Sequence, residues 1–313
     1  MEQKTNTQEQ QTDRKNWFDK SYKLLMLLPI LLTISAVIYL GFFYYSHNNE
    51  IILRDVSLSG GTMITLTANS NMMEFEEFKL ALEQKSALRG VDVSLRKLTD
   101  IGTGKTLSIV VESSSNSEEL KADIESILGY PLTNENSSIE FSESSLGNNF
   151  FNQLMIALLI AFALMSIVIF IMFRTFIPSI AVIFAAFSDI IVPLAIVDFF
   201  GVKLSAAGIA AFLMLVGYSV DTDILLTTRA LDPKKTRDEN LNKRIFGAFK
   251  TGTLMTSTAL LAVLPAFFIV TGLPDSFRQI FLILALGLFA DLIFTWMANA
   301  GIIKWYCEKK GIK

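Results

Sequence analysis

Six long apolar segments constrain the fold of this chain more than any other feature of its 313 residues. A helix needs about 20 apolar residues to cross roughly 30 Å of hydrocarbon. The mean hydropathy is +0.46 and 18% of the residues are charged, whereas charged residues make up about 25% of a typical soluble domain. We therefore predict an α-helical polytopic membrane protein with six transmembrane helices, which cover residues 24–45, 151–173, 177–200, 204–226, 251–270 and 280–303.

Basic residues predict the orientation of these spans, because short cytoplasmic loops are enriched in Lys and Arg. The tail 1–23 carries four basic residues close to the first span, the loop 227–250 carries seven, and the tail 304–313 carries four. The short loops on the other side contain only Lys203 and Arg278. We therefore expect a multi-pass protein of the plasma membrane with both termini in the cytoplasm.

The segment 46–150 then lies outside the cytoplasm, and it is acidic, with sixteen Asp and Glu against eight Lys and Arg. Its apolar residues alternate in some stretches and follow helical spacing in others, which predicts the order β-α-β-β-α-β. This is the order of a ferredoxin-like α+β domain. The predicted strands are 62–67, 91–98, 106–111 and 139–142, and the predicted helices are 74–86 and 117–128, the second with Ser117 as its N-cap.

Three smaller features lie at the edges of this domain and of the third span. Gly60 and Gly61 directly precede Thr62, so the backbone at this strand entry is predicted to need unusual torsions or a close approach. Residues 134–145 are polar and are predicted to be the linker that returns to the membrane. Asp198, at the end of the third span, is expected to be solvated.

Four carboxylates lie within the predicted spans, where ionisable residues are functional hypotheses because their burial is costly. They are Asp189, Asp221, Asp223 and Asp291, and no Lys or Arg lies at a comparable depth. A buried carboxylate without a counter-charge tends to take up a proton, so these four are the proton-relay candidates. Asp221 and Asp223 point about 200° apart on a helix, so they cannot share one site.

Small and hydroxyl-bearing residues accompany these acids. Gly217 lies one turn before Asp221 and would let another helix pack closely. Hydroxyls for a polar path are offered by Ser219, Thr222, Thr256 and Ser257. An alternative stays open, in which the hydroxyls serve only helix packing and single protonated carboxylates serve only assembly.

Other kinds of chemistry have no support in the sequence. It contains no pairing of a nucleophile with a base, no cluster of metal ligands and no cofactor motif. We therefore expect a protein that is not an enzyme and has no catalytic residue, no metal and no cofactor. The outer domain is interpreted as a binding or lever module.

Five segments together resemble the SecF family of protein-export membrane proteins, whose members work with SecD and belong to the resistance-nodulation-division (RND) superfamily. They are DVSLSGGTMITL at 55–66, SDI at 188–190, VGYSVDTDILLTTR at 216–229, GTLMTS at 252–257 and DLIFTWMANA at 291–300. The third segment is the most specific. Its Asp-Thr-Asp form, together with the last segment, is similar to the archaeal branch of the family.

The resemblance extends over nearly the whole chain and implies an accessory subunit of the Sec translocase, built as half of an RND-type unit and driven by the proton gradient. The implied partners are SecD, the Sec translocation channel, the translocating polypeptide and membrane lipid, with no nucleic acid. The resemblance favours Asp221 over Asp223, because the paired subunit also places an aspartate there. Two alternatives remain: half of an RND-type exporter of small molecules or lipids, and a non-transporting assembly scaffold of the channel complex.

One position departs from the family pattern. Bacterial relatives carry an Arg just before Thr-Leu-x-Thr-Ser at the start of the fifth span, where this chain has Gly252. The nearest cation, Lys250, is expected at the membrane interface. Either SecD supplies the counter-charge of a relay or this branch couples to protons in a different way.

Overall fold

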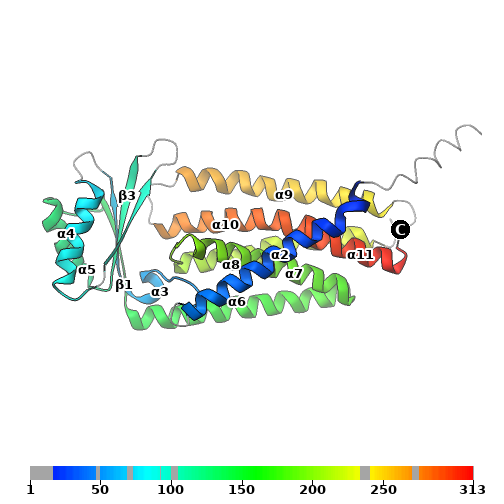
Figure 1. Cartoon of the computed structure of the whole chain (residues 1–313), viewed down its shortest axis with the longest axis horizontal. Coiled ribbons are helices and arrows are strands. Elements are labelled where there is room, and N and C mark those ends of the chain that lie inside the picture. The colour runs from blue at the N-terminus through cyan, green and yellow to red at the C-terminus, as the bar shows by residue number, and fades with distance from the viewer. Residues whose placement is uncertain are drawn as a thin grey trace, which may run out of the picture.

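The computed structural model describes residues 17–46, 50–68, 73–91, 93–99, 105–232, 240–269 and 275–312. Six helices in this part are long and apolar enough to cross a membrane, and Figure 1 shows them together in one bundle. They are α2 (Trp17–Ser46), α6 (Ser144–Phe173), α7 (Phe176–Phe199), α8 (Ala206–Leu231), α9 (Leu241–Ile269), and a last helix built from α10 (Asp275–Ile293), the π-helical η2 (Phe294–Asn299) and α11 (Ala300–Lys310). The prediction of a polytopic helical membrane protein is confirmed.

Several of these helices extend beyond the predicted spans. The largest difference concerns residues 227–250, which were expected to be a loop, because α8 continues to Leu231 and α9 already begins at Leu241. The length of an apolar run predicts only the part of a helix that lies in hydrocarbon. It does not predict the polar turns by which these helices continue beyond the membrane. Most of the tail 1–23 lies outside the described residues.

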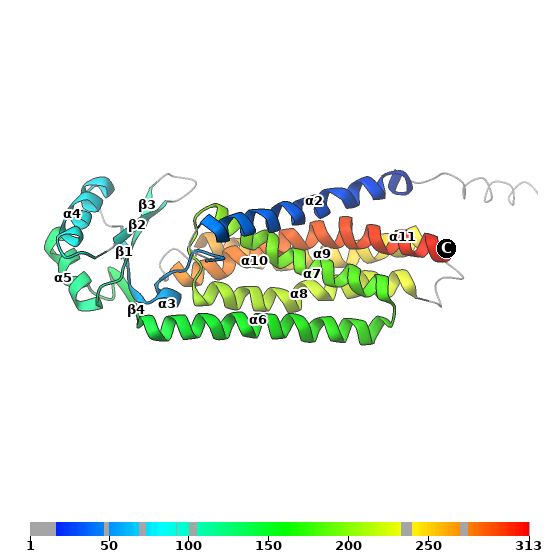
Figure 2. The ribbon, with the colours of Figure 1, turned by 60° about the horizontal axis from the view of Figure 1, so that its bottom comes forward.

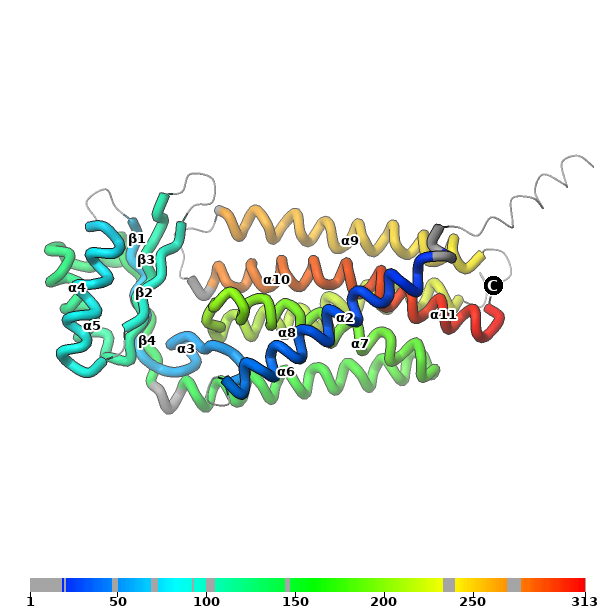
Figure 3. The backbone as a smooth tube through the Cα atoms, viewed as in Figure 1, coloured from blue at the N-terminus to red at the C-terminus, as the bar shows by residue number. Residues whose placement is uncertain are grey.

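The bundle has two different ends (Figures 1 and 2). A small sheet with two helices lies beyond one end, and the C-terminus lies at the other. The tube in Figure 3 shows α2 running from the C-terminal end toward the sheet, and the α7–α8 turn lies at the sheet end. Helix α8 ends and helix α9 begins at the C-terminal end of the bundle. The described basic residues of these helix ends therefore lie far from the sheet: Arg229 of α8, Lys243 and Arg244 of α9, and Lys309 and Lys310 of α11.

The sheet has four antiparallel strands in the order β2-β3-β1-β4. In chain order these are β1 (Gly61–Thr67), β2 (Val93–Thr99), β3 (Thr106–Ser113) and β4 (Ser137–Ser142). Two helices, α4 (Phe75–Ala87) and α5 (Ser117–Leu128), pack on one face, where Phe78 and Ile124 contribute to a buried core with Ile64 and Val111. The strands and helices therefore follow each other in the predicted order.

Two local details of this region differ from the sequence predictions. The cap of α5 is Asn116, whose side chain accepts a hydrogen bond from the Glu118 N–H, and Ser117 is the first helical residue. Residues 134–145 contain β4, which the predicted strand 139–142 matches, and also the beginning of α6, so little of the stretch is the linker that was expected there. A short edge strand with alternating exposure has the polarity of a linker, so composition alone does not separate the two.

The two glycines at the entry of β1 have the backbone that the sequence predicts. Gly60 has a φ of 87° and Gly61 a φ of 125°, a region that residues with a Cβ rarely adopt. A Cβ on Gly61 would lie 2.4 Å from the carbonyl oxygen of Ser113 on the neighbouring strand. Both the unusual torsions and the close approach are therefore present.

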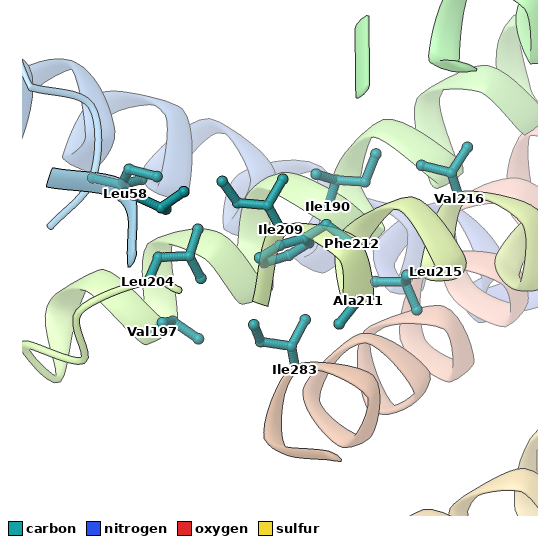
Figure 4. Close-up of a cluster of buried hydrophobic side chains, with 11 residues drawn as sticks. Leu58, Ile190, Val197, Leu204, Ile209, Ala211, Phe212, Leu215, Val216 and Ile283 are labelled. Carbon is teal, nitrogen blue, oxygen red and sulfur yellow. The ribbon is translucent and has the colours of Figure 1, made fainter. Parts of the chain in front are cut away.

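The core of the bundle lies between α7, α8 and α10. Figure 4 shows Ile190, Phe212 and Ile283 from these three helices converging on one cluster, with Leu58 of the short helix α3 (Val56–Ser59) at its edge. About 61% of the α7 span and 56% of the α8 span are buried, against 6% for α6 and 17% for α9. Helices α6 and α9 therefore present most of their surface outward, to lipid or to a partner.

The end of α7 is tied to the segment that follows α2. Asp198 is 4% exposed, and it accepts hydrogen bonds from the Leu53 N–H and the Tyr39 hydroxyl, each at 3.2 Å. The expectation that Asp198 is solvated was wrong. Its position at the end of an apolar run suggested water, but the chain entering the sheet domain folds back over it.

Candidate functional site

Three of the four membrane carboxylates come together inside the bundle. Asp189 on α7, Asp223 on α8 and Asp291 on α10 each have 0% of their surface exposed, and each carboxylate feels the charge of at least one of the others. They lie on the helices that pack most tightly, so protein atoms and not lipid surround them. We call these three residues the acid cluster.

One hydroxyl joins two members of the acid cluster. Thr295 Oγ1 lies 2.9 Å from Asp223 Oδ1 and 3.0 Å from Asp291 Oδ1. A threonine hydroxyl has a single proton and can donate to only one oxygen at a time. Both contacts are hydrogen bonds only when one of the carboxyls carries a proton and donates it to Thr295. The geometry at Thr295 therefore suits a cluster that holds an extra proton.

The remaining contacts of the acid cluster also come from neutral donors. Thr256 on α9 donates to Asp291 Oδ2 at 3.0 Å, and Ser219 on α8 donates to Asp189 Oδ2. Asp189 Oδ1 and Asp223 Oδ2 are buried without a hydrogen-bond partner in the described part of the chain. No basic side chain among the described residues forms an ion pair with the acid cluster. The acid cluster is therefore held by neutral donors alone among the described residues.

A π-helical turn brings two donors to Asp223. The helix that contains Asp291 changes from α to π geometry over η2, which begins three residues after Asp291. In this turn the Asn299 side chain donates to Asp223 Oδ1 at 2.7 Å, the same oxygen that Thr295 reaches. π-helical turns are rare and are frequent at functional sites. Asp223 is thus held from one side by the last helix.

Asp221 lies apart from the acid cluster. Its side chain is exposed, as expected from the angle of about 200° to Asp223. Gly217, one turn earlier, has no atom within 4 Å of a Cβ placed on it, so nothing in the described chain packs there. Gly217 and Asp221 together form an open patch on α8. The favoured residue of the sequence analysis is therefore at the surface of this chain, and Asp223 is in its interior.

Some of the predicted hydroxyl residues contact the acid cluster and others do not. Ser219 and Thr256 donate to members of the acid cluster. Thr222 is buried, and its hydroxyl has no partner among the described residues. Ser257 is half-buried on α9. The strand-entry residues Gly60, Gly61 and Thr62 lie in the sheet domain, where the Thr62 hydroxyl donates to the Ser115 carbonyl at 2.7 Å.

Gly252 has a tight environment. A Cβ at this position would lie 2.5 Å from Trp296 Cζ2 and 2.9 Å from Thr222 Cγ2. The indole of Trp296 therefore occupies the space beside α9, and the arrangement leaves no room for an arginine at residue 252. An aromatic ring fills the space beside Gly252.

The helix that carries Asp291 also holds the turn beneath the sheet. Gln279 on α10 is 6% exposed; it accepts from the Ser205 N–H at 2.7 Å and donates to the Lys203 carbonyl at 2.6 Å. Lys203 in turn forms an ion pair with Glu112 of β3, which Arg96 of β2 also contacts at 2.9 Å. One continuous set of contacts thus leads from α10 to the sheet.

Sequence reasoning did not single out four residues of these networks: Thr295, Trp296, Asn299 and Gln279. A signal for two of them was present. Asp291, Thr295 and Asn299 recur at four-residue spacing, which places polar groups on one face of a helix. The π-helical geometry and the role of Gln279 have no comparable signal in the sequence.

Among the described residues, no cluster of His, Cys, Asp and Glu suits a metal ion.

Comparisons with known proteins give a consistent result. The family model described as "Protein export membrane protein SecD/SecF, C-terminal" matches residues 126–309. Proteins named "Protein-export membrane protein SecF" are similar over 92% of the chain: that of Methanolacinia petrolearia is 36% identical and covered over 95% of its length, and that of Methanothermobacter thermautotrophicus is 36% identical and covered over 94%. The one from Methanocaldococcus jannaschii is 34% identical, with 96% covered.

Solved structures share the fold at lower identity. The crystal structure of SecDF from Thermus thermophilus, described as a translocon-associated membrane protein, superposes on 94% of the chain with a TM-score of 0.71 and 18% identity. SecDF in its super-membrane-facing form gives a TM-score of 0.59. The chain spans 39% of the length of either solved protein, so it matches one part of a larger molecule.

Proposed function

This chain belongs to the SecF branch of the SecD/SecF family of protein-export membrane proteins, and we propose from that premise that it is an accessory subunit of the Sec translocase. It would assist protein export across the plasma membrane together with SecD and the translocation channel. The SecDF structures place this fold within a longer chain. The chain would accordingly be half of an RND-type unit that SecD completes.

The open patch on α8 supports the need for a second half. A carboxylate exposed to hydrocarbon is costly, and small residues are enriched where membrane helices approach closely. Asp221 is exposed and Gly217 has free space above it, one helical turn away. We propose that SecD covers this patch and provides a hydrogen-bond donor or a cation for Asp221.

The proposed topology follows the charge distribution. The described basic residues at the end of α8, the start of α9 and the end of α11 lie at the bundle end far from the sheet, so this end and both termini would be cytoplasmic. Residues 46–150 would then form a ferredoxin-like domain outside the cytoplasm, with the strand order β2-β3-β1-β4 in its support. Its proposed partner there is the translocating polypeptide.

The acid cluster supports a proton-driven mechanism. The observation that carries this proposal is the single Thr295 hydroxyl shared between Asp223 and Asp291, because the shared contact is complete only with an extra proton in the cluster. When that proton leaves, two carboxylates compete for one donor and repel each other. α8 and α10, which carry them, would then favour a different packing.

The same helix would transmit this change to the outer domain. Asp291 and Gln279 both lie on α10, and Gln279 holds the turn that carries Lys203. Lys203 is paired with Glu112 in the central strand β3. A small displacement of α10 would therefore pull on the sheet through side chains that are already in contact.

The test is export measured with and without an imposed proton gradient, in membranes that contain the complete translocase. Asp223→Asn keeps the size of the side chain and removes the exchangeable charge, so gradient-stimulated export should fall to the level seen without a gradient. Asp232→Asn is the matched control, since it makes the same change at the end of α8, outside both the acid cluster and the patch around Asp221, and its gradient dependence should persist. If Asp223→Asn responds to the gradient as the native protein does, the relay is wrong and the assembly-scaffold alternative is favoured.

A further inference from the structure

A cavity of about 220 Å³ lies between the edge strand β2 and the sheet-side ends of α9 and α10. Its walls differ in chemistry. The sheet contributes three polar residues, Arg96, Lys97 and Thr99, together with Leu98, whereas Val202, Phe267 and Leu282 are apolar and come from the membrane part, and Arg278 comes from α10. The cavity is thus polar toward the sheet and apolar toward the hydrocarbon, which is the profile of a membrane–water boundary.

Arg278 lines this cavity from α10. Its guanidinium lies over the Phe267 ring, 4.9 Å from the centroid. Its Nε is buried without a hydrogen-bond partner in the described chain, and no carboxylate among the described residues forms an ion pair with it. A buried donor without an acceptor is costly. The site therefore lacks an acceptor.

The neighbouring groups do not supply that acceptor. Glu112 on the neighbouring strand β3 is already engaged by Arg96 and Lys203. The Gln279 amide is likewise committed, because its oxygen accepts from Ser205 and its nitrogen donates to the Lys203 carbonyl. Three cations, Arg96, Lys97 and Arg278, line the cavity, and its described lining residues include no carboxylate. The local excess of positive charge favours an anion.

We propose that this cavity binds a phosphate group, carried by an anionic lipid of the adjoining leaflet or free in solution. The planar guanidinium of an arginine matches a phosphate with two parallel hydrogen bonds. The cavity is smaller than the roughly 300–1,000 Å³ of typical small-molecule sites, so it accommodates a head group and not a whole lipid. The apolar wall formed by Phe267 and Leu282 would carry the first part of a hydrocarbon chain. The proposal does not depend on the role of the protein in export.

Three probes separate phosphate from hydrocarbon and one source from the other. The full chain, purified in detergent, is titrated with dihexanoylphosphatidylglycerol, with dihexanoylglycerol, which has the same chains and no phosphate, and with inorganic phosphate. Binding is followed by native mass spectrometry and by the shift of the thermal midpoint. We expect the phospholipid to bind and dihexanoylglycerol not to bind. Comparable binding of inorganic phosphate identifies free phosphate as the source, and its weaker binding identifies the lipid.

Arg278→Gln should weaken binding of the phospholipid by at least about tenfold, because a hydrogen bond to a charged group is lost. Arg278→Lys keeps the charge but not the planar pair of donors, so it should bind the phospholipid more weakly than the native chain and more tightly than Arg278→Gln. Lys79→Gln, the same charge change on the far helix α4, should leave the affinity unchanged. Equal binding of the two hexanoyl compounds, or an unchanged affinity in Arg278→Gln, would overturn the proposal.

Discussion

The Asn299 side-chain amide donates to Asp223 Oδ1 at 2.7 Å, and this contact joins the π-helical turn of the last membrane helix to α8. Thr295 reaches the same oxygen. The other oxygen of Asp223, Oδ2, has no partner in the part of the chain described. The two donors thus fix the orientation of the carboxyl and make Oδ1 its accepting oxygen, so the proton that completes the shared contact would lie on Asp291 Oδ1, 3.0 Å from the Thr295 hydroxyl.

Thr295→Val should destabilise the protein measurably. The substitution keeps the branched shape but removes the hydroxyl that Asp223 and Asp291 share. Hydrogen bonds between membrane helices contribute about 0.6 kcal/mol on average and up to about 1.7 kcal/mol, and a value near the upper end is expected because two carboxyls lose a partner. The measurement is the free energy of unfolding in mixed micelles.

The control for this change is Thr228→Val on α8. Thr228 is exposed, and its hydroxyl bonds only to the Ile224 carbonyl of its own helix. Its loss should change the free energy of unfolding by less than about 0.5 kcal/mol. A double-mutant cycle of Thr295→Val with Asp223→Asn should show coupling, and strict additivity of the two effects would mean that the shared hydroxyl does not connect them.

Gly252→Ala should destabilise the bundle although alanine is the better helix former. The added methyl would lie 2.5 Å from the Trp296 ring, and overpacking of this kind typically costs about 1–3 kcal/mol. Gly217→Ala is the matched control, since nothing lies within 4 Å there, and it should raise stability by up to about 1 kcal/mol. Adding Trp296→Phe to Gly252→Ala should restore part of the loss. Equal thermal midpoints for the two alanine variants would contradict this packing.

Glu112→Gln should loosen the sheet domain from the bundle. Glu112 is 4% exposed and balances Arg96 and Lys203, whose side chains are 28% and 30% exposed. Breaking a fully buried pair costs about 3–5 kcal/mol, but these partly hydrated cations should reduce the loss to about 1–2 kcal/mol. Faster hydrogen exchange in β2 and β3 would report it. Glu83→Gln, in an exposed pair with Lys79 on α4, should leave that exchange unchanged.

The sequence predicted the elements of the fold better than the contacts between them. Apolar length located six spans because each must cover the same hydrocarbon thickness, and alternation located the strands of the sheet domain. Helical periodicity also separated Asp221 from Asp223. Which of these two aspartates faces the interior depends on how α8 is rotated against α7 and α10. Apolar residues occur on most sides of α8, so its hydrophobic pattern did not show which side faces the interior.

The remaining part of the site depends on geometry that no local pattern encodes. The π-helical turn at Phe294–Asn299 adds a residue to one helical turn and directs Asn299 toward Asp223. Likewise, Gln279 reads as an ordinary polar residue near a span end. Its role arises because the α7–α8 turn places the Ser205 N–H and the Lys203 carbonyl where the Gln279 side-chain amide can bond to both. Both features follow from tertiary packing, which sequence spacing does not describe.

The folded state at the entry to the sheet domain should lose stability as the pH rises, because of Asp55. This residue is 2% exposed, and burial raises its pKa to about 7, with hydrogen bonds from Ser57 opposing the shift. Between about pH 4 and pH 7 the folded chain therefore keeps a proton that the unfolded chain has lost. Ionisation is less favourable in the folded state, so the stability present at low pH decreases as the pH rises through 7.

Hydrogen exchange of α3 (Val56–Ser59), corrected for the intrinsic effect of pH, should show this directly. The pKa shift predicts that the free energy of local opening is about 2 kcal/mol lower at pH 8 than at pH 5.5. Asp55→Asn removes the ionisable group but keeps a good N-cap, because an asparagine oxygen can still accept from the Ser57 N–H that Asp55 binds at 2.9 Å. The variant should therefore keep the α3 protection and lose its pH dependence. An equal pH dependence in both proteins would assign the effect to another group, and a loss of α3 protection at both pH values would mean that the Asp55 carboxylate is needed for the cap.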